Sequence, residues 1–196
     1  MTIKQKFLKA VYPAFITLTK LTGKNTKILY NDKGAKPVSS IYDLSFRSNT
    51  AAEFSLSKFR GKKMLLVNTA SDCGYTPQYE ELQKLHLHSC DKVVVLGFPA
   101  NDFRQQEQGS DKEIHTFCTI NFGVTFPLAK RSVVVKNAEQ NEIFQWLTDS
   151  RKNGWNTQPP TWNFSKYLVN EQGVLTHYFD PSVSPVNAEV MKPIND

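Results

Sequence analysis

The chain has 196 residues, 40% of them hydrophobic, which is enough for one globular domain with short extensions and excludes general disorder. The net charge is +6, and the positive excess lies in residues 1–36, which hold eight lysines and one aspartate. The nearly balanced remainder does not suit a nucleic-acid-binding core. Three widely spaced cysteines exclude a disulfide scaffold and fit a reducing compartment or a protein that uses thiols chemically. We therefore expect a cytoplasmic protein that binds no nucleic acid.

Residues 1–22 predict a basic amphipathic helix with a kink at Pro13. Three interpretations of this helix stay open: it docks on the domain by its apolar stripe, it lies on an anionic lipid surface, or it is a signal peptide. Docking is favoured over the signal peptide because Lys20 interrupts the apolar region. The apolar residues at helical spacing are Ile3, Phe7, Val11, Phe15, Leu18 and Leu21.

Glycine, asparagine and proline make residues 23–38 resemble a linker, so we divide the chain into an extension, 1–38, and a domain, 39–196. At the start of the domain, residues 41–46 alternate as a strand does, and residues 52–56 are expected to pair with them as a hairpin.

The stretch from Lys62 to Leu85 predicts a buried strand, a turn and a helix. Thr76 is suited to the N-cap of that helix and Pro77 to its first helical position. Cys73 then lies just before a helix N-terminus, where the positive end of the helix dipole favours a thiolate. This placement makes Cys73 a candidate nucleophile.

The rest of the chain completes an α/β pattern with a parallel pair of strands early and an antiparallel pair late. A second buried strand at 93–98 implies a parallel βαβ unit with the first. Further elements are a helix capped by Ser110, a strand at 133–135, a helix at 139–150, a hairpin turning at 171–173, and a last helix after residue 184.

Two other features of the sequence indicate structural roles and not catalytic or metal-binding ones. Cys90 closes a helix before a strand, and a lone cysteine of this kind is usually buried. The spacing His86-x-His88-x-Cys90 does not place these residues on one helix face, so no metal site is predicted there. We expect neither a metal nor a cofactor.

Several blocks of the chain resemble the glutathione peroxidase family, in the family's order and over about residues 39–185. The nucleophile block runs from Val67 to Tyr79 and reads VNTASDCGYTPQY. The others read LGFPANDF at 96–103, QE at 106–107, FC at 117–118, FGVTFPL at 122–128 and WNFSKYL at 162–168.

The resemblance implies a thioredoxin-like fold, a central mixed sheet flanked by helices, and reduction of hydroperoxides by a peroxidatic cysteine at Cys73. It places Gln106, Trp162 and Asn163 at the family's other catalytic positions. An amide and an indole N–H can donate to a thiolate or a peroxide oxygen without competing as bases. The thiolate would become a sulfenic acid.

Cys118 resembles the resolving cysteine of the thioredoxin-dependent branch, which implies a Cys73–Cys118 disulfide opened by thioredoxin. Three alternatives stay open: Cys118 is a buried helix residue, the reductant is glutathione, or the protein is a peroxide sensor that relays oxidation to a partner. Asp102, Arg104 and Gln108 depart from the residues common in the family around Gln106. The segment between the strand at 133–135 and Trp162 lacks the long insertion of tetrameric members, so we expect a monomer.

Overall fold

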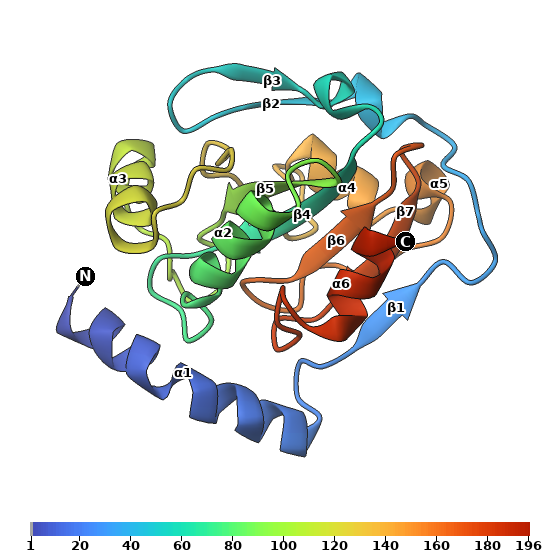
Figure 1. The fold of residues 1–196 in the computed structure, drawn as a ribbon. Helices are drawn as coiled ribbons and strands as arrows, with labels where there is room; N and C mark the ends of the chain where they lie inside the picture. The colour runs from blue at the N-terminus through green and yellow to red at the C-terminus, as the bar shows by residue number, and fades with distance from the viewer. Residues whose placement is uncertain (1) are drawn as a thin grey trace.

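The computed structural model describes residues 2–196 as one mixed β-sheet covered by helices, with a separate two-stranded hairpin (Figure 1). The strands are β1 Ile28–Tyr30, β2 Ser45–Arg47, β3 Glu53–Ser55, β4 Lys63–Thr69, β5 Val93–Pro99, β6 Lys166–Val169 and β7 Leu175–Phe179. The helices are α1 Ile3–Thr22, α2 Gln78–His88, α3 Asp111–Phe122, α4 Glu142–Leu147, α5 Ser150–Asn153 and α6 Ala188–Asn195, with 3₁₀ turns η1 Ile41–Asp43 and η2 Leu56–Phe59.

The main sheet has the strand order β1-β7-β6-β4-β5. β4 pairs with β5 in parallel, as expected for a strand–helix–strand unit, and with β6 antiparallel. β6 and β7 form the expected late hairpin. Every residue of β4 and β5 is buried, because both faces of the sheet are covered.

Side chains alternate across the sheet and build two cores. One face, with Leu65 and Val95, packs against α1, α2, α3 and α6 and contains both Cys73 and Cys118. The other face, with Leu66, packs against η1 and α4. The two cysteines of the implied disulfide therefore belong to the same side of the sheet.

Helix α1 runs unbroken through Pro13 along the outside of the fold (Figure 1). The face that docks is centred on Tyr12, Ile16 and Thr19, and in the described part of the chain only Phe15 of the stripe expected from the sequence packs with them against the core. Of that expected stripe, Ile3 and Leu21 are among the exposed members, with 89% and 80% of their surface open. Among residues 2–196 there is no helix that is both long and apolar enough to cross a bilayer.

The expectation of a linker at 23–38 is wrong in one part, because β1 pairs antiparallel with β7 at the edge of the main sheet. The strand expected at 41–46 is also partly wrong. Its first half is the 3₁₀ turn η1, capped by the hydroxyl of Ser40, and only its second half forms the hairpin β2–β3. The hairpin itself is confirmed.

Three further expectations need correction. Residues 133–135 form only an isolated bridge, from Val133 to Gln140, because the chain turns away into the cap of α4. The helix expected at 139–150 is divided into α4, capped by Asn141, and α5, capped by Asp149. Cys90 is exposed and not buried, since it lies in the turn between α2 and β5.

Candidate active site

Cys73 lies in a turn between β4 and α2. Its backbone N–H donates to the Thr76 hydroxyl at 2.9 Å, and that hydroxyl donates to the carbonyl of Ala70 at 2.9 Å. Thr76 therefore closes the turn and does not cap α2, contrary to our expectation. The helix begins at Gln78 without a side-chain cap.

Side chains from two distant loops meet at the Cys73 thiol. The backbone N–H of Tyr75 donates to Cys73 Sγ at 3.4 Å, and the side chains of Asn163 and Trp162 lie near enough to lower the pKa of the same thiol. Asn163 Nδ2 also donates to Gln106 Oε1 at 3.0 Å. The four residues singled out from the sequence, Cys73, Gln106, Trp162 and Asn163, thus come together in space.

Asn68, at the end of β4, holds the loop that carries Trp162 and Asn163. Its side-chain Nδ2 donates to the carbonyl of Trp162 at 3.1 Å, and its Oδ1 accepts from the backbone N–H of Ser165 at 3.0 Å. Between them Phe164 has φ +68°, a left-handed conformation that costs a non-glycine residue about 1–3 kcal/mol. The Phe164 ring packs edge-on against Tyr79 at 5.3 Å, which helps to hold this strained loop.

Burial raises the pKa of the Cys73 thiol, against the expectation that the helix dipole would favour a thiolate. The N–H groups of Tyr75, Asn163 and Trp162 lower this pKa, but the loss of water outweighs them because the residue is only 1% exposed. The nearby carboxylate of Asp72 adds to the increase. Burial of Cys73 in this closed arrangement therefore opposes the thiolate form.

Cys118 lies in the middle of α3 and faces the core. Burial raises the pKa of its thiol to about 12, although the neighbouring hydroxyl of Tyr79 lowers it. Both Cys73 and Cys118 are free thiols in this structure. A disulfide between Cys73 and Cys118 requires their Cα atoms to lie within about 7 Å of each other.

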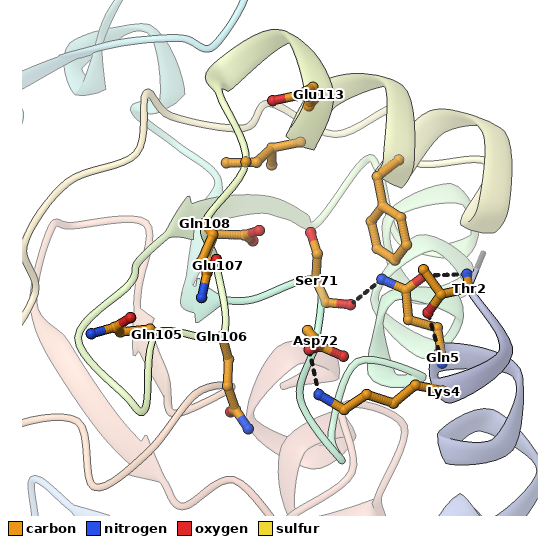
Figure 2. Close-up of a pocket in the computed structure, with 13 residues that line it drawn as sticks. Thr2, Lys4, Gln5, Ser71, Asp72, Gln105, Gln106, Glu107, Gln108 and Glu113 are labelled. Carbon is orange, nitrogen blue, oxygen red and sulfur yellow. Dashed lines mark hydrogen bonds and ion pairs between the residues drawn. The ribbon is translucent and has the colours of Figure 1, made fainter.

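A pocket of about 870 Å³ opens beside the Cys73 turn (Figure 2). Cys73 is not among its lining residues, but its neighbour Asp72 and the candidate catalytic residue Gln106 are. The walls come from the first turn of α1, from the Cys73 turn, from the Gln106 loop and from α3. They are Thr2, Lys4, Gln5, Ser71, Asp72, residues 105–109, Glu113, Ile114 and Phe117.

Glu107 is a buried acid in the wall of this pocket. It is 1% exposed, and its backbone N–H donates to Asn101 Oδ1 at 2.9 Å. Burial raises the pKa of its carboxyl to about 7, while hydrogen bonds from Ser71 and the charge of Arg131 lower it. Glu107 in turn raises the pKa of Cys118, so it is electrostatically linked to the candidate resolving thiol.

Arg104, which departs from the family pattern, and its neighbour Phe103, which matches it, both contact Trp162 in this site. The ring of Phe103 lies 5.4 Å from that of Trp162, and the Arg104 guanidinium lies 5.6 Å from the same indole. Arg104 and Gln105 both have positive φ, at 52° and 53°, so this loop is strained. The Arg104 substitution therefore places a cation over the indole that faces Cys73.

Sequence reasoning missed Asn68, Glu107, Lys4 and Gln5 as parts of the site. The sequence does indicate a role for Asn68, because a polar residue at the end of a buried strand needs hydrogen-bond partners. Nothing in the sequence showed that Lys4 and Gln5 would reach the Cys73 turn.

The fold and the site define a cysteine-based redox protein of the thioredoxin-like class. A crystal structure described as "Trgpx in apo form" is similar with a TM-score of 0.60 and 27% identity, covering 81% of this chain and 97% of that one. A DsbF homologue from Corynebacterium diphtheriae matches with a TM-score of 0.60 over 89% of this chain and 93% of its own, and at 18% identity it supports the fold alone. These similarities confirm the expected fold.

The chain belongs to the glutathione peroxidase family, whose model "Glutathione peroxidase" matches residues 41–148, and it is thus an oxidoreductase of the peroxidase kind. "Glutathione peroxidase homolog BsaA" of Staphylococcus epidermidis is 41% identical over 78% of this chain and 98% of its own. "Glutathione peroxidase-like peroxiredoxin 2" of Saccharomyces cerevisiae is 38% identical over 74% of this chain and 90% of its own.

Proposed function

We propose that this protein is a thiol peroxidase that reduces hydrogen peroxide and organic or lipid hydroperoxides at Cys73. The observation that carries the proposal is the proximity of the Trp162 and Asn163 side chains, whose N–H groups lower the pKa of Cys73, to a cysteine thiol in a chain of this family. These donors suit a sulfur that becomes negative and an oxygen that leaves as an anion. Gln106 orients Asn163 through their shared hydrogen bond.

The first chemical step oxidises Cys73 and reduces the peroxide. The thiolate attacks one peroxide oxygen, so an S–O bond forms and the O–O bond breaks. The leaving alkoxide or hydroxide takes a proton and departs as an alcohol or water, while Cys73 becomes a sulfenic acid. Because burial raises the pKa of the resting thiol, the step needs the proton to be removed as substrate enters.

In the second step Cys118 resolves the sulfenic acid. Its sulfur attacks Cys73, an S–S bond forms, the S–O bond breaks and water leaves with the proton of Cys118. A reduced dithiol protein then opens the disulfide and becomes oxidised itself. Thioredoxin is the reductant that we favour, because a relative at 38% identity is named a peroxiredoxin and Cys118 matches the resolving position.

Peroxide consumption with thioredoxin, thioredoxin reductase and NADPH tests this cycle. We expect sustained turnover by the wild-type protein and by Cys90→Ser, which removes an exposed thiol, and loss of turnover in Cys118→Ser. Turnover that survives in Cys118→Ser would favour glutathione as the reductant. Oxidation of Cys73 without turnover by any reductant would favour a peroxide sensor.

We also infer that the protein is a cytoplasmic monomer that touches anionic lipid through α1. The support is a second apolar face on α1, opposite the docked one, on a segment with a lysine excess. Four large side chains on this face are exposed: Ile3, Phe7, Leu18 and Leu21. Free thiols fit a reducing compartment.

Co-sedimentation with anionic vesicles tests the lipid contact, and light scattering tests the monomer. We expect the doubly substituted Ile3→Gln, Phe7→Gln protein to lose vesicle binding. Leu87→Gln is the matched control, since it removes an exposed apolar side chain of α2. Equal binding by all three proteins would remove the lipid proposal.

A further inference from the structure

The first turn of α1 is attached to the Cys73 turn. Lys4 forms an ion pair with Asp72, and Gln5 Nε2 donates to the carbonyl of Ser71 at 3.1 Å. Figure 2 shows both side chains reaching from α1 to these two residues at one wall of the pocket. The two residues that precede Cys73 are therefore both held from α1.

The middle of α1 holds the other side of the turn. The ring of Phe15 packs against that of Tyr75 with centroids 5.0 Å apart. Phe15 also covers Gly74, where a Cβ atom would lie 3.6 Å from the phenyl ring. Cys73 is enclosed between these two attachments, and this agrees with its 1% exposure.

Helix α1 also contacts the elements that would have to move. Lys9 pairs with Glu80 in α2, and its ammonium lies 5.5 Å from the ring centroid of Phe122. Phe122 is the last residue of α3, the helix that carries Cys118. One helix thus bridges the turn of the peroxidatic cysteine and the helix of the candidate resolving cysteine.

We propose that α1 is a positioning element of the Cys73 turn, and that it has to leave the turn before Cys73 and Cys118 can join. The second half rests on the two-cysteine cycle proposed above. Both cysteines are free thiols, Cys73 in the turn and Cys118 in α3, and α1 holds that turn from two sides, so any movement of the turn that joins the two sulfurs breaks its contacts with α1. The polar attachments of α1 suit reversible release, because the Lys4–Asp72 pair is partly exposed and such pairs are weak.

The first half is tested by alkylation of reduced Cys73 with iodoacetamide, in a full-length chain with Cys90→Ser and Cys118→Ser so that Cys73 is the single thiol. We expect about fivefold faster alkylation when the Lys4 and Gln5 side chains are both cut to alanine, and again in Phe15→Ala. Lys4→Arg keeps the ion pair and should retain the slow rate. The matched control is Thr17→Ala, an exposed residue whose hydroxyl donates to the carbonyl of Pro13 within the same helix.

Thermal melting of each variant shows whether it is folded. Unchanged alkylation in folded Phe15→Ala and in the Lys4, Gln5 double variant would overturn the positioning role. An equal acceleration in Thr17→Ala would overturn it as well, because the effect would then be a general loosening of α1. This readout needs no peroxidase activity, so it stands even if the proposed function fails.

The second half is tested by amide hydrogen exchange on the Cys90→Ser protein, before and after one equivalent of hydrogen peroxide. We expect the amides of α1 to exchange faster once the disulfide has formed, and to stay protected in the matched Cys118→Ser protein after the same treatment. Protection that persists in the disulfide form would overturn release of α1. If mass spectrometry finds no disulfide, the two-cysteine cycle and the release step fail together, while the alkylation result still decides the positioning role.

Discussion

The side-chain amide of Asn163 donates to the side-chain carbonyl of Gln106 at 3.0 Å, across 57 residues of sequence. This bond holds the Asn163 amide in one orientation, and its N–H group lowers the pKa of the Cys73 thiol. We predict that Asn163→Ala lowers kcat/KM for hydrogen peroxide about a hundredfold, as expected when one donor to a developing anion is removed.

Steady-state kinetics with thioredoxin measures this loss. Gln172→Ala, which truncates an exposed amide in the turn between β6 and β7, is the control and should leave kcat/KM unchanged. A similar rate constant for Asn163→Ala and wild type would show that Asn163 does not assist the reaction.

The pH dependence of Cys73 alkylation follows from its surroundings. Burial raises the pKa of Cys73, and the Trp162 N–H lowers it. Trp162→Phe removes this donor and keeps a ring beside Phe103, so the pKa rises further and less thiolate is present at pH 8. We predict that alkylation at pH 8 slows by roughly threefold to tenfold, since one unit of pKa is a tenfold change in thiolate.

A pH profile of iodoacetamide alkylation, with Cys73 as the single cysteine, checks this shift. Trp155→Phe is the matched control, because its indole N–H donates to the carbonyl of Leu175 at 2.7 Å. Superimposable profiles for Trp162→Phe and wild type would mean that the indole does not affect the pKa of the Cys73 thiol.

The buried acid Glu107 makes stability depend on pH. The unfolded chain loses this proton near the ordinary value of 4.5, whereas burial raises the pKa in the folded protein to about 7. Between these values the folded protein binds more protons than the unfolded chain, so the free energy of unfolding falls as pH rises. The fall due to Glu107 is about 3 kcal/mol, and it is complete above pH 7.

Urea unfolding at pH 5 and pH 8 measures this difference. Glu107→Gln cannot ionise, so we expect its free energy of unfolding to change less between the two pH values than that of wild type. Glu139→Gln, which alters an exposed acid, should follow wild type. Identical pH slopes for all three proteins would show that Glu107 ionises freely.

Gly97 is required by close packing between β5 and the segment at 124–128. A Cβ atom at this position would lie 2.5 Å from Leu128 Cδ2 and 3.2 Å from Phe126 Cε2. We predict that Gly97→Ala destabilises the protein by roughly 1–3 kcal/mol, toward the lower end because a terminal methyl group can rotate away. In combination with Leu128→Ala the loss measured by urea unfolding should be smaller than the sum of the two single losses. Strict additivity would contradict the packing argument.

Features that depend on residues close together in the sequence could be predicted, whereas contacts between distant residues could not. The strand, turn and helix around Cys73 follow from a local apolar run and turn residues, and the structure has them in that order. The hydroxyl of Thr76 could either cap helix α2 or bond within the turn. In the structure it accepts a hydrogen bond from the backbone N–H of Cys73, so it belongs to the turn. The contact of Asn163 with Gln106 needs tertiary structure, so only the family resemblance indicated it.

Helix α1 shows a second limit. Helical periodicity identified the helix correctly, but apolar residues lie on more than one face, and periodicity does not say which face meets the domain. The docked face is decided by Tyr12 and Ile16, together with partners in α2 and the Cys73 turn that are distant in sequence. Cys90 was misjudged for a related reason, since burial statistics for cysteine say nothing about a particular turn.

The exposure of Cys90 means that the first thiol an oxidant or a neighbouring molecule meets is not a thiol of the proposed cycle. Two copies of the chain can be cross-linked through this surface sulfur while Cys73 and Cys118 stay enclosed. A dimer band on a non-reducing gel would therefore indicate oxidation of Cys90 during storage in air, and not catalytic turnover. Total thiol counts would drop before any catalytic sulfur had reacted.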